Sequence, residues 1–118
     1  MNQATQFRRD LHQIPETSFT EFKTKEYVVS VLKTLHCEVI ELLETGAAAY
    51  FDAGRPATLA YRADMDALPI QEEKTNGGGS QKACVSEIPG VQHACGHDGH
   101  TAMLLTAAKL LQAHRETL

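Results

Sequence analysis

The chain has 118 residues, of which 42% are hydrophobic and 22% are charged, and its formal net charge is −4. This length suits one small domain, and the composition is that of a folded globular protein rather than a disordered one. The 11 lysine and arginine residues are scattered, so no basic stripe favours binding to nucleic acid. No apolar stretch approaches the roughly 18–20 residues that cross a bilayer, and the first residues lack the apolar core of a secretory signal. We therefore expect a cytoplasmic protein that does not contact a membrane.

The first third of the chain is predicted to form two helices. The first covers residues 4–13 and is ended by Pro15, because the residue before a proline is pushed out of the helical region. The second covers residues 20–36, where most apolar positions fall on one helical stripe. Ser18 or Thr20 is expected to cap this second helix.

The hydrophobic period then changes to one typical of strands. Residues 37–42 alternate, Gly46 interrupts the pattern, and residues 47–51 form a short apolar run. A turn at 52–56 separates this run from a further expected strand at 58–63. Two helices followed by strands and tight turns indicate an α/β domain, with the helices packed on a central sheet.

A long segment without helical or strand period follows, from residue 71 to 92. Loops of this length within a compact domain are usually functional or disordered. A helical pattern resumes at about Gly99 and is still running near the end of the chain.

The strongest chemical signal is the segment HACGHDGH at residues 93–100. It holds three imidazoles, one thiol and one carboxylate directly before the last predicted helix, and its glycines allow tight folding of the backbone. Imidazole and thiolate are preferred ligands of zinc and similar ions. The other interpretation is a histidine-rich surface turn. Outside this segment, Cys37 is expected to be a small buried residue, and His36 and His114 to be solvated ends of helices.

The second signal is the pair Asp64 and Asp66, which follows the end of a predicted strand. If the strand pleat continues, both carboxylates face the same side. An Asp-x-Asp pair by itself is also explained by a capped turn. Next to a histidine cluster it gains weight, because metal-bound histidines usually need an outer carboxylate that fixes their tautomer.

Two motifs together resemble the amidohydrolase branch of metallopeptidase family twenty, namely RADMDALPI and the later GVQHACGHDGHTAMLL. This branch includes hippurate hydrolases, N-acyl-amino-acid amidohydrolases and plant auxin-conjugate hydrolases. The stretches FRRDLHQIPETSFTEFKT and TGAAAYFDAGRPATLAYRAD are similar to the same family, so the resemblance covers almost the whole chain.

The resemblance implies a zinc-exopeptidase-like catalytic α/β domain with two divalent ions, which could be Zn, Mn, Co or Ni. Cys95 and His97 match metal ligands, with Cys95 as the bridge between the ions, and Asp66 matches the catalytic carboxylate that supports the site. Asp64 and His100 are weaker candidates. His93 belongs to the motif without being assigned as a ligand.

The implied reaction is hydrolysis of the amide bond of a small N-acyl amino acid by a metal-activated water. Residues 1–118 would form the N-terminal part of the catalytic domain. The rest of that domain would be absent, with the general-base glutamate and further ligands, and so would the lid domain that often forms a homodimer contact. We therefore expect the isolated chain to be inactive. The sequence also departs from the family pattern in the glycine-rich stretch between the motifs, residues 76–80.

Two other hypotheses stay open. Four residues could complete one closed tetrahedral zinc site in a module without catalytic activity: Cys84, Cys95, His97 and His100. The chain could also be a truncated gene product with no function of its own, whose sheet would keep an unpaired, aggregation-prone edge.

Overall fold

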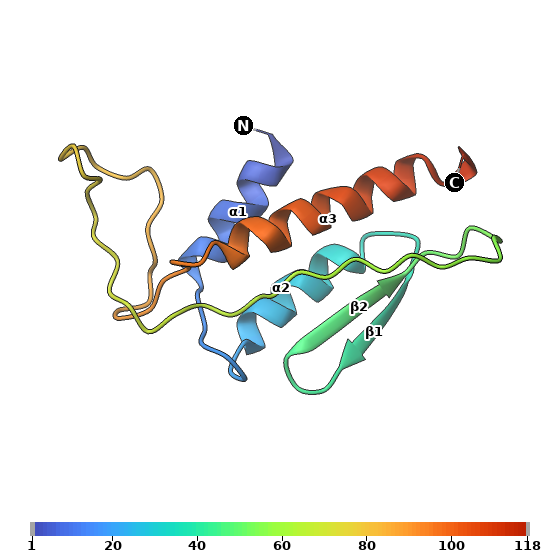
Figure 1. The fold of residues 1–118 in the computed structure, drawn as a ribbon, viewed down its shortest axis with the longest axis horizontal. Helices are drawn as coiled ribbons and strands as arrows, with labels where there is room; N and C mark the ends of the chain where they lie inside the picture. Colours follow the sequence, from blue (N-terminus) through green and yellow to red (C-terminus); the bar gives the residue numbers. More distant parts are fainter. Residues whose placement is uncertain (1, 118) are drawn as a thin grey trace.

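The computed structural model describes residues 2–117, which contain three α-helices, one two-stranded sheet and a short 3₁₀ helix (Figure 1). In chain order these elements are α1 (Gln3–Gln13), α2 (Phe22–Leu32), β1 (Glu38–Leu42), β2 (Gly46–Tyr50), α3 (His97–Ala113) and η1 (Arg115–Thr117). The mixed α/β class is therefore confirmed. None of the helices in this part of the chain is long and apolar enough to cross a membrane.

Helix α1 confirms the first predicted helix to within one residue at its start. The Asn2 side chain caps it by accepting a hydrogen bond from the Thr5 backbone N–H at 2.9 Å. The helix ends at Gln13, ahead of Pro15. Its last turn brings the buried side chain of His12 into the interior.

Helix α2 is shorter than predicted and is capped differently. Its N-cap position is Glu21, which makes no capping hydrogen bond with its side chain. The Glu16 carboxylate does this from outside the helix, because it accepts from the backbone N–H groups of Lys23 at 3.0 Å and Thr24 at 2.8 Å. The prediction of Ser18 or Thr20 as the cap is therefore wrong: the Ser18 hydroxyl donates to an aspartate far along the chain.

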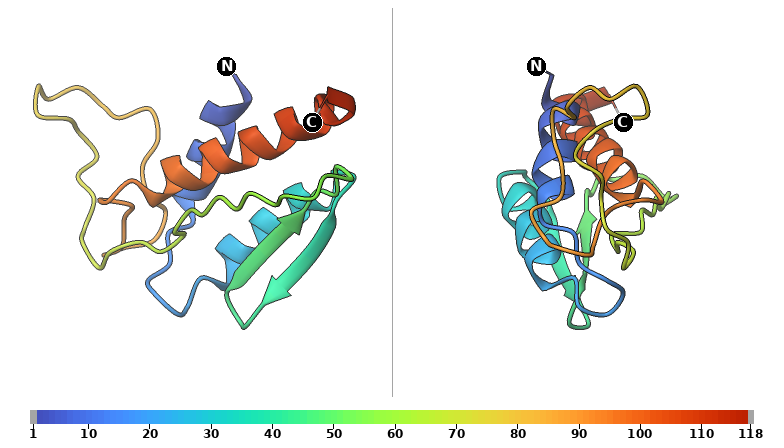
Figure 2. Two further views of the ribbon diagram at one scale, coloured as in Figure 1. Left: turned by 45° about the vertical axis from the view of Figure 1, so that its right-hand side comes forward. Right: turned by 90° about the vertical axis from the view of Figure 1, so that its left-hand side faces the viewer.

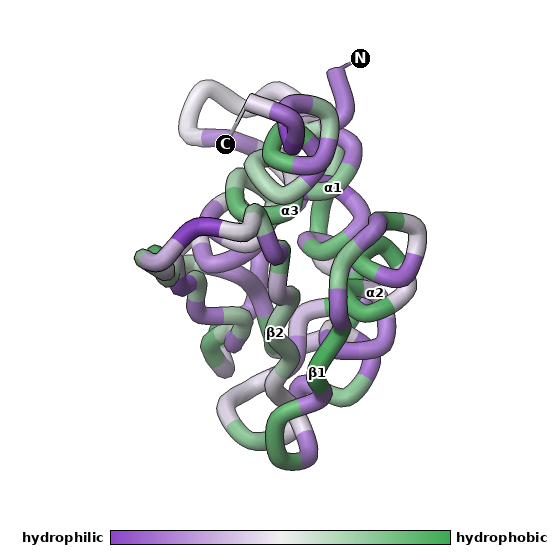
Figure 3. The backbone as a smooth tube through the Cα atoms, turned by 90° about the vertical axis from the view of Figure 1, so that its right-hand side faces the viewer, coloured by the Kyte–Doolittle hydropathy of each residue, from purple (hydrophilic) through white to green (hydrophobic). Residues whose placement is uncertain are grey.

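Strands β1 and β2 form an antiparallel hairpin in which Leu42 pairs with Gly46. The glycine is required by the close approach of the two strands, since a Cβ atom at position 46 would lie 2.8 Å from the Leu42 carbonyl oxygen. Figure 3 colours the end of β1 as hydrophobic where it enters the hairpin turn, and the Leu43 side chain in this turn is 96% exposed.

The third predicted strand, residues 58–63, is not a strand. The segment is extended across the molecule in Figure 1, but it pairs with no other part of the described chain. Leu59 and Tyr61 are strongly exposed. Alternating hydrophobicity indicates a half-buried strand, yet a strand also needs a hydrogen-bonding partner, and within residues 2–117 the sheet consists of β1 and β2 alone.

The core lies where the three helices meet. Helix α1 packs against α3, and α2 packs against both α3 and the hairpin. In the two views of Figure 2 the hairpin lies below α1 and α3. The buried cluster consists of Phe7, Leu11, Val28, Leu32, Leu35, Ala102, Leu105 and Ala108. Helix α3 therefore has a fixed place, and its first turn carries the histidine-rich motif.

Residues 71–92 form a long loop, as predicted, with no helix or strand in it. Its glycine-rich tip is closed by Asn76, whose side-chain oxygen accepts from the backbone N–H groups of Gly78 and Ser80. The loop returns to the rest of the molecule through Leu68 and Gln92, which exchange backbone hydrogen bonds at 2.9 and 3.0 Å. Residues 93–96 follow this pair of hydrogen bonds and lead directly into the first turn of α3.

Candidate metal centre

The turn between the two candidate ligands is built on Gly96. This residue has φ of 85°, in the left-handed region that favours glycine, and it is the N-cap of α3. Its carbonyl oxygen accepts from the backbone N–H groups of Gly99 and His100, which starts the helix. Cys95 therefore lies just outside α3 and His97 is its first residue, two positions before the predicted start of this helix at about Gly99.

His97 is oriented by Asp66. The Nδ1 atom of His97 lies 2.9 Å from Asp66 Oδ1 and 3.0 Å from the Asp66 backbone oxygen. Because both of these oxygens are acceptors, Nδ1 carries the proton and donates, and Nε2 keeps its lone pair. This is the arrangement that prepares a histidine to bind a metal through Nε2.

Asp66 is itself held in place by Ser18, whose hydroxyl donates to Asp66 Oδ2 at 2.7 Å. This hydrogen bond, and then the one from His97, hold the pKa of the Asp66 carboxyl below its usual value, so Asp66 is an acceptor at neutral pH. Asp64 and Asp66 were expected to face the same site, but they do not. The Asp64 carboxylate pairs with Arg62 at 3.0 Å, and only its backbone oxygen contacts α3, through Thr101.

The other cysteines and histidines lie in different environments. Cys95 and His100 are exposed, and the His100 ring lies 5.7 Å from the His97 ring between centroids. His93 is buried with no hydrogen-bond partner at either ring nitrogen, and burial lowers its pKa, which favours the neutral ring. Cys84 donates to the Arg9 carbonyl oxygen at 3.5 Å, and burial raises the pKa of its thiol. Cys37 was expected to be buried and is half-buried, while His36 and His114 are exposed as expected.

The donors fit a divalent transition metal in their chemistry, because they offer a thiol and an imidazole with a free Nε2. Within residues 2–117, however, no group of three or more histidine, cysteine, aspartate or glutamate side chains is arranged to hold one ion. The four-ligand zinc site considered from the sequence is thus not assembled, since Cys84 is engaged elsewhere. The arrangement resembles part of an open site that further ligands would complete.

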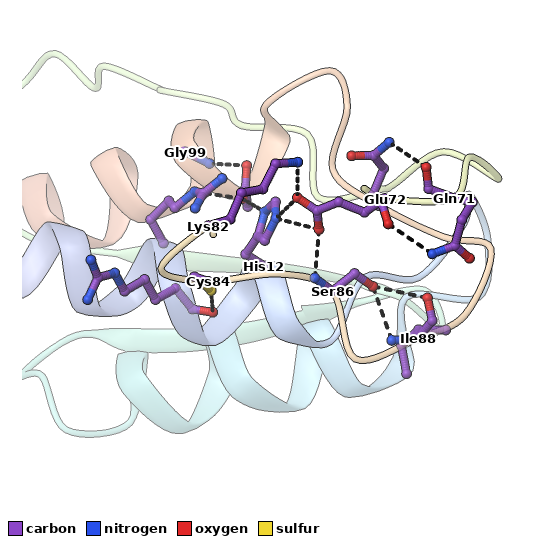
Figure 4. A network of polar contacts seen from close by, with 12 residues as sticks. His12, Gln71, Glu72, Lys82, Cys84, Ser86, Ile88 and Gly99 are labelled. Atoms are coloured by element: carbon purple, nitrogen blue, oxygen red, sulfur yellow. Dashed lines mark hydrogen bonds and ion pairs between the residues drawn. The ribbon is translucent and has the colours of Figure 1, made fainter. Parts of the chain in front are cut away.

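A buried network of ion pairs lies behind the first turn of α3 (Figure 4). The His12 ring stands between two carboxylates: Nδ1 is 2.6 Å from Asp98 Oδ2, and Nε2 is 3.0 Å from Glu72 Oε2. Arg8 adds a contact of 3.0 Å to Asp98, and Lys82 adds one of 3.1 Å to Glu72. The network therefore connects α1, α3 and the long loop.

Both ring nitrogens of His12 face carboxylate oxygens, so both must donate, and His12 is an imidazolium. The hydrogen bond with Asp98 raises the pKa of His12, against the effect of burial and with help from Glu72. Burial by itself would raise the pKa of both carboxyls. At Asp98, hydrogen bonds from His12 and from the Gly99 N–H outweigh the effect of burial and lower the pKa. At Glu72, hydrogen bonds from the Ser86 N–H and from His12 do the same.

These pKa shifts predict how stability depends on pH. The raised pKa of His12 means that its contribution is complete below the unfolded value of 6.5 and is lost as the pH rises through the folded value. The lowered pKa values of Asp98 and Glu72 mean that their contribution is lost as the pH falls through their folded values. The pKa of His93 is lowered, so its effect on stability has the opposite pH dependence to that of His12: it destabilises the fold as the pH falls.

A variant tests the His12 contribution, although the charge of His12 is also one of the causes that lower the pKa of His93, so the change includes both effects. The difference in thermal unfolding midpoint between the wild type and His12→Gln should be largest at about pH 5–6 and should shrink as the pH is raised above about 7. Unfolding followed by circular dichroism across this range checks it. A difference that stays constant or grows with pH would show that His12 is not charged in the folded protein.

Sequence reasoning missed this network. Arg8 and His12 are one helical turn apart, which indicates a shared charged face on α1, but Glu72 lies in a segment without any period. The signal that was available is the single carboxylate at position 98 inside the histidine motif. This carboxylate needs a hydrogen-bonding partner, but the sequence does not indicate which residue provides one.

Comparisons with known proteins show the family to which the chain belongs. Residues 60–118 match the Peptidase family M20/M25/M40, and the chain belongs to that family. It is 46% identical over 114 residues to an N-acyl-L-amino acid amidohydrolase of Geobacillus stearothermophilus, covering 95% of this chain and 29% of that protein. It is 43% identical over 112 residues to the IAA-amino acid hydrolase ILR1-like 2 of Arabidopsis thaliana, covering 94% of this chain and 24% of that protein.

The structure is also similar to a solved one. The YXEP protein of Bacillus subtilis, described as a dinuclear metal-binding peptidase of the same family, superposes with a TM-score of 0.86 at 39% sequence identity. The match covers 98% of this chain and 32% of that chain. The chain thus spans less than a third of the length of each of these three proteins.

Proposed function

We propose that this chain is the N-terminal part of the catalytic domain of a metal-dependent amidohydrolase that acts on small N-acyl amino acids. The names of the relatives support the reaction class, and the contact between His97 and Asp66 is the observation that carries it. The parent enzyme would complete the catalytic domain with further chain and add a lid domain through which two copies could associate.

In this proposal each residue of the turn has one task. Cys95 would hold metal through its thiolate, and His97 would hold metal through Nε2. Asp66 keeps the His97 ring in the required tautomer and orientation, and Ser18 holds the Asp66 carboxylate. Divalent ions bound there would polarise the amide carbonyl and lower the pKa of a bound water.

The proposal is tested by titrating the purified protein with Co²⁺, whose bond to a thiolate gives a characteristic near-ultraviolet absorption band. We expect the band in the wild type and its loss in Cys95→Ala, because the exposed thiol beside the left-handed turn is the ligand. Cys84→Ala is the matched control and should keep the band, since the Cys84 thiol donates to the Arg9 carbonyl.

The opposite pattern, with the band lost in Cys84→Ala and kept in Cys95→Ala, would contradict the assignment. Loss of the band in both variants would favour the closed four-ligand zinc site instead. Two candidate donors fall short of the three protein ligands that are typical of a catalytic zinc. We therefore expect the 118-residue chain to bind metal without hydrolysing N-acyl amino acids at an appreciable rate.

A further inference from the structure

His12 occupies a buried position that the proposed metal chemistry does not use. Its exposed fraction is 3%, and those of Asp98 and Glu72 are 2% and 8%. Each carboxylate also accepts a backbone N–H: Gly99 donates to Asp98 Oδ1 at 2.8 Å, and Ser86 donates to Glu72 Oε2 at 2.6 Å. His12 is thus the one side chain shown in Figure 4 that is bonded to both carboxylates.

The two contacts of the α3 first turn lie on different sides of the helix. Consecutive residues of an α-helix are rotated by about 100° around its axis. Asp98 is directed to His12 of α1, while His97, the residue before it, is directed to Asp66. A rotation or shift of the first turn would break both contacts together, so the Asp98 contact also determines where His97 lies.

The Glu72 side of the network holds the loop in the same way. Glu72 accepts from His12, from Lys82 and from the Ser86 N–H, so the outgoing and the returning arms of the loop at 71–92 meet at one carboxylate, and this carboxylate bonds to the His12 ring. The returning arm leads through Gln92 to the metal-binding turn. His12 therefore contacts α3 directly, through Asp98, and the long loop through Glu72.

We propose that His12 is a positioning residue that sets the geometry of the metal-binding turn by bonding to Asp98 and Glu72 at the same time. The proposal rests on metal binding by Cys95 and His97. It differs from a role in stability alone, because a buried ion pair is weak support for stability and in some proteins serves to specify one conformation.

The experiment compares His12→Gln with His114→Gln, the same change at the exposed histidine that follows the other end of α3. Two quantities are measured: the Co²⁺ dissociation constant, and hydrogen exchange of the Gly99 and His100 amides in metal-free protein. In His12→Gln we expect the dissociation constant to rise about tenfold, the size of effect typical when support around a metal site is lost. Exchange at Gly99 and His100 should also become faster, while exchange in β1 and β2 stays the same.

The outcomes separate the two proposals. If His12→Gln folds and keeps both the wild-type dissociation constant and the wild-type exchange at Gly99 and His100, the positioning role is wrong. If the wild type binds no Co²⁺, the proposed metal binding is wrong, and hydrogen exchange in the metal-free protein still decides whether His12 fixes the turn.

If His12→Gln does not fold, the variant Glu72→Gln decides, since it keeps the size of the side chain and the His12–Asp98 contact. It should raise exchange at Ser86 and weaken Co²⁺ binding, and wild-type values for both would overturn the proposal.

Discussion

Replacing Asp66 with asparagine should weaken Co²⁺ binding by about tenfold, at the lower end of the 10- to 100-fold range known for residues that support metal ligands. The asparagine oxygen is a poorer acceptor than a carboxylate, and its amide can turn an N–H toward His97 Nδ1. The effect stays moderate because the Asp66 backbone oxygen, 3.0 Å from Nδ1, remains as a second acceptor. A Co²⁺ titration of the variant measures it.

Asp64→Asn is the matched control, because it makes the same chemical change two residues away. The Asp64 carboxylate pairs with Arg62, and within residues 2–117 its side chain makes no hydrogen bond to His97. Its affinity for Co²⁺ should stay within about twofold of the wild type, a change smaller than 0.5 kcal/mol. Equal losses in both variants would mean that the effect is one of net charge, and Asp66 would lose its assigned role.

Leu11→Ala should lower the free energy of unfolding by about 3 kcal/mol, within the usual range of about 2–5 kcal/mol for such a change in a core. Leu11 is 1% exposed and belongs to the cluster in which α1, α2 and α3 meet. Truncation removes three buried carbon atoms and leaves a cavity that rigid helices fill only in part. Urea denaturation of the metal-free protein measures the loss.

Leu43→Ala is the control for this substitution. Leu43 is 96% exposed at the turn of the hairpin, so its truncation should change the free energy of unfolding by less than about 0.5 kcal/mol. A similar loss in both variants would show that the residue at position 11 is not in a packed core. The placement of α1 against α3 would then need revision.

The elements that could be predicted from the sequence are those with a strong local signal. The helical period gave α1 and the body of α3, and strand alternation with a glycine between the two runs indicated the hairpin. The rule that a metal-bound histidine needs an outer carboxylate left Asp64 and Asp66 both open, and the family resemblance implied Asp66, which the structure places against His97. The roles of Cys95, His97 and Asp66 in metal binding stay predictions.

The features that were missed depend on partners that lie outside the segment in which the pattern was sought. Glu16 caps α2 from outside the helix, which no pattern within the helix indicates. The expected strand at 58–63 has the right alternation but lacks a neighbour among residues 2–117. His12 and Glu72 are 60 residues apart, and they meet only because α1 and the long loop both lie beside α3.

The packing of α1 on α3 also has a consequence for how the chain folds as it is made. His12 and Asp98 are separated by 86 positions, so the partner surface of α1 leaves the ribosome long after α1 itself. At about 5–20 residues per second, Leu11 and Phe7 wait several seconds before the residues that cover them have been synthesised. These apolar side chains of α1 are therefore exposed until α3 has been made, and in that interval a chaperone could bind them.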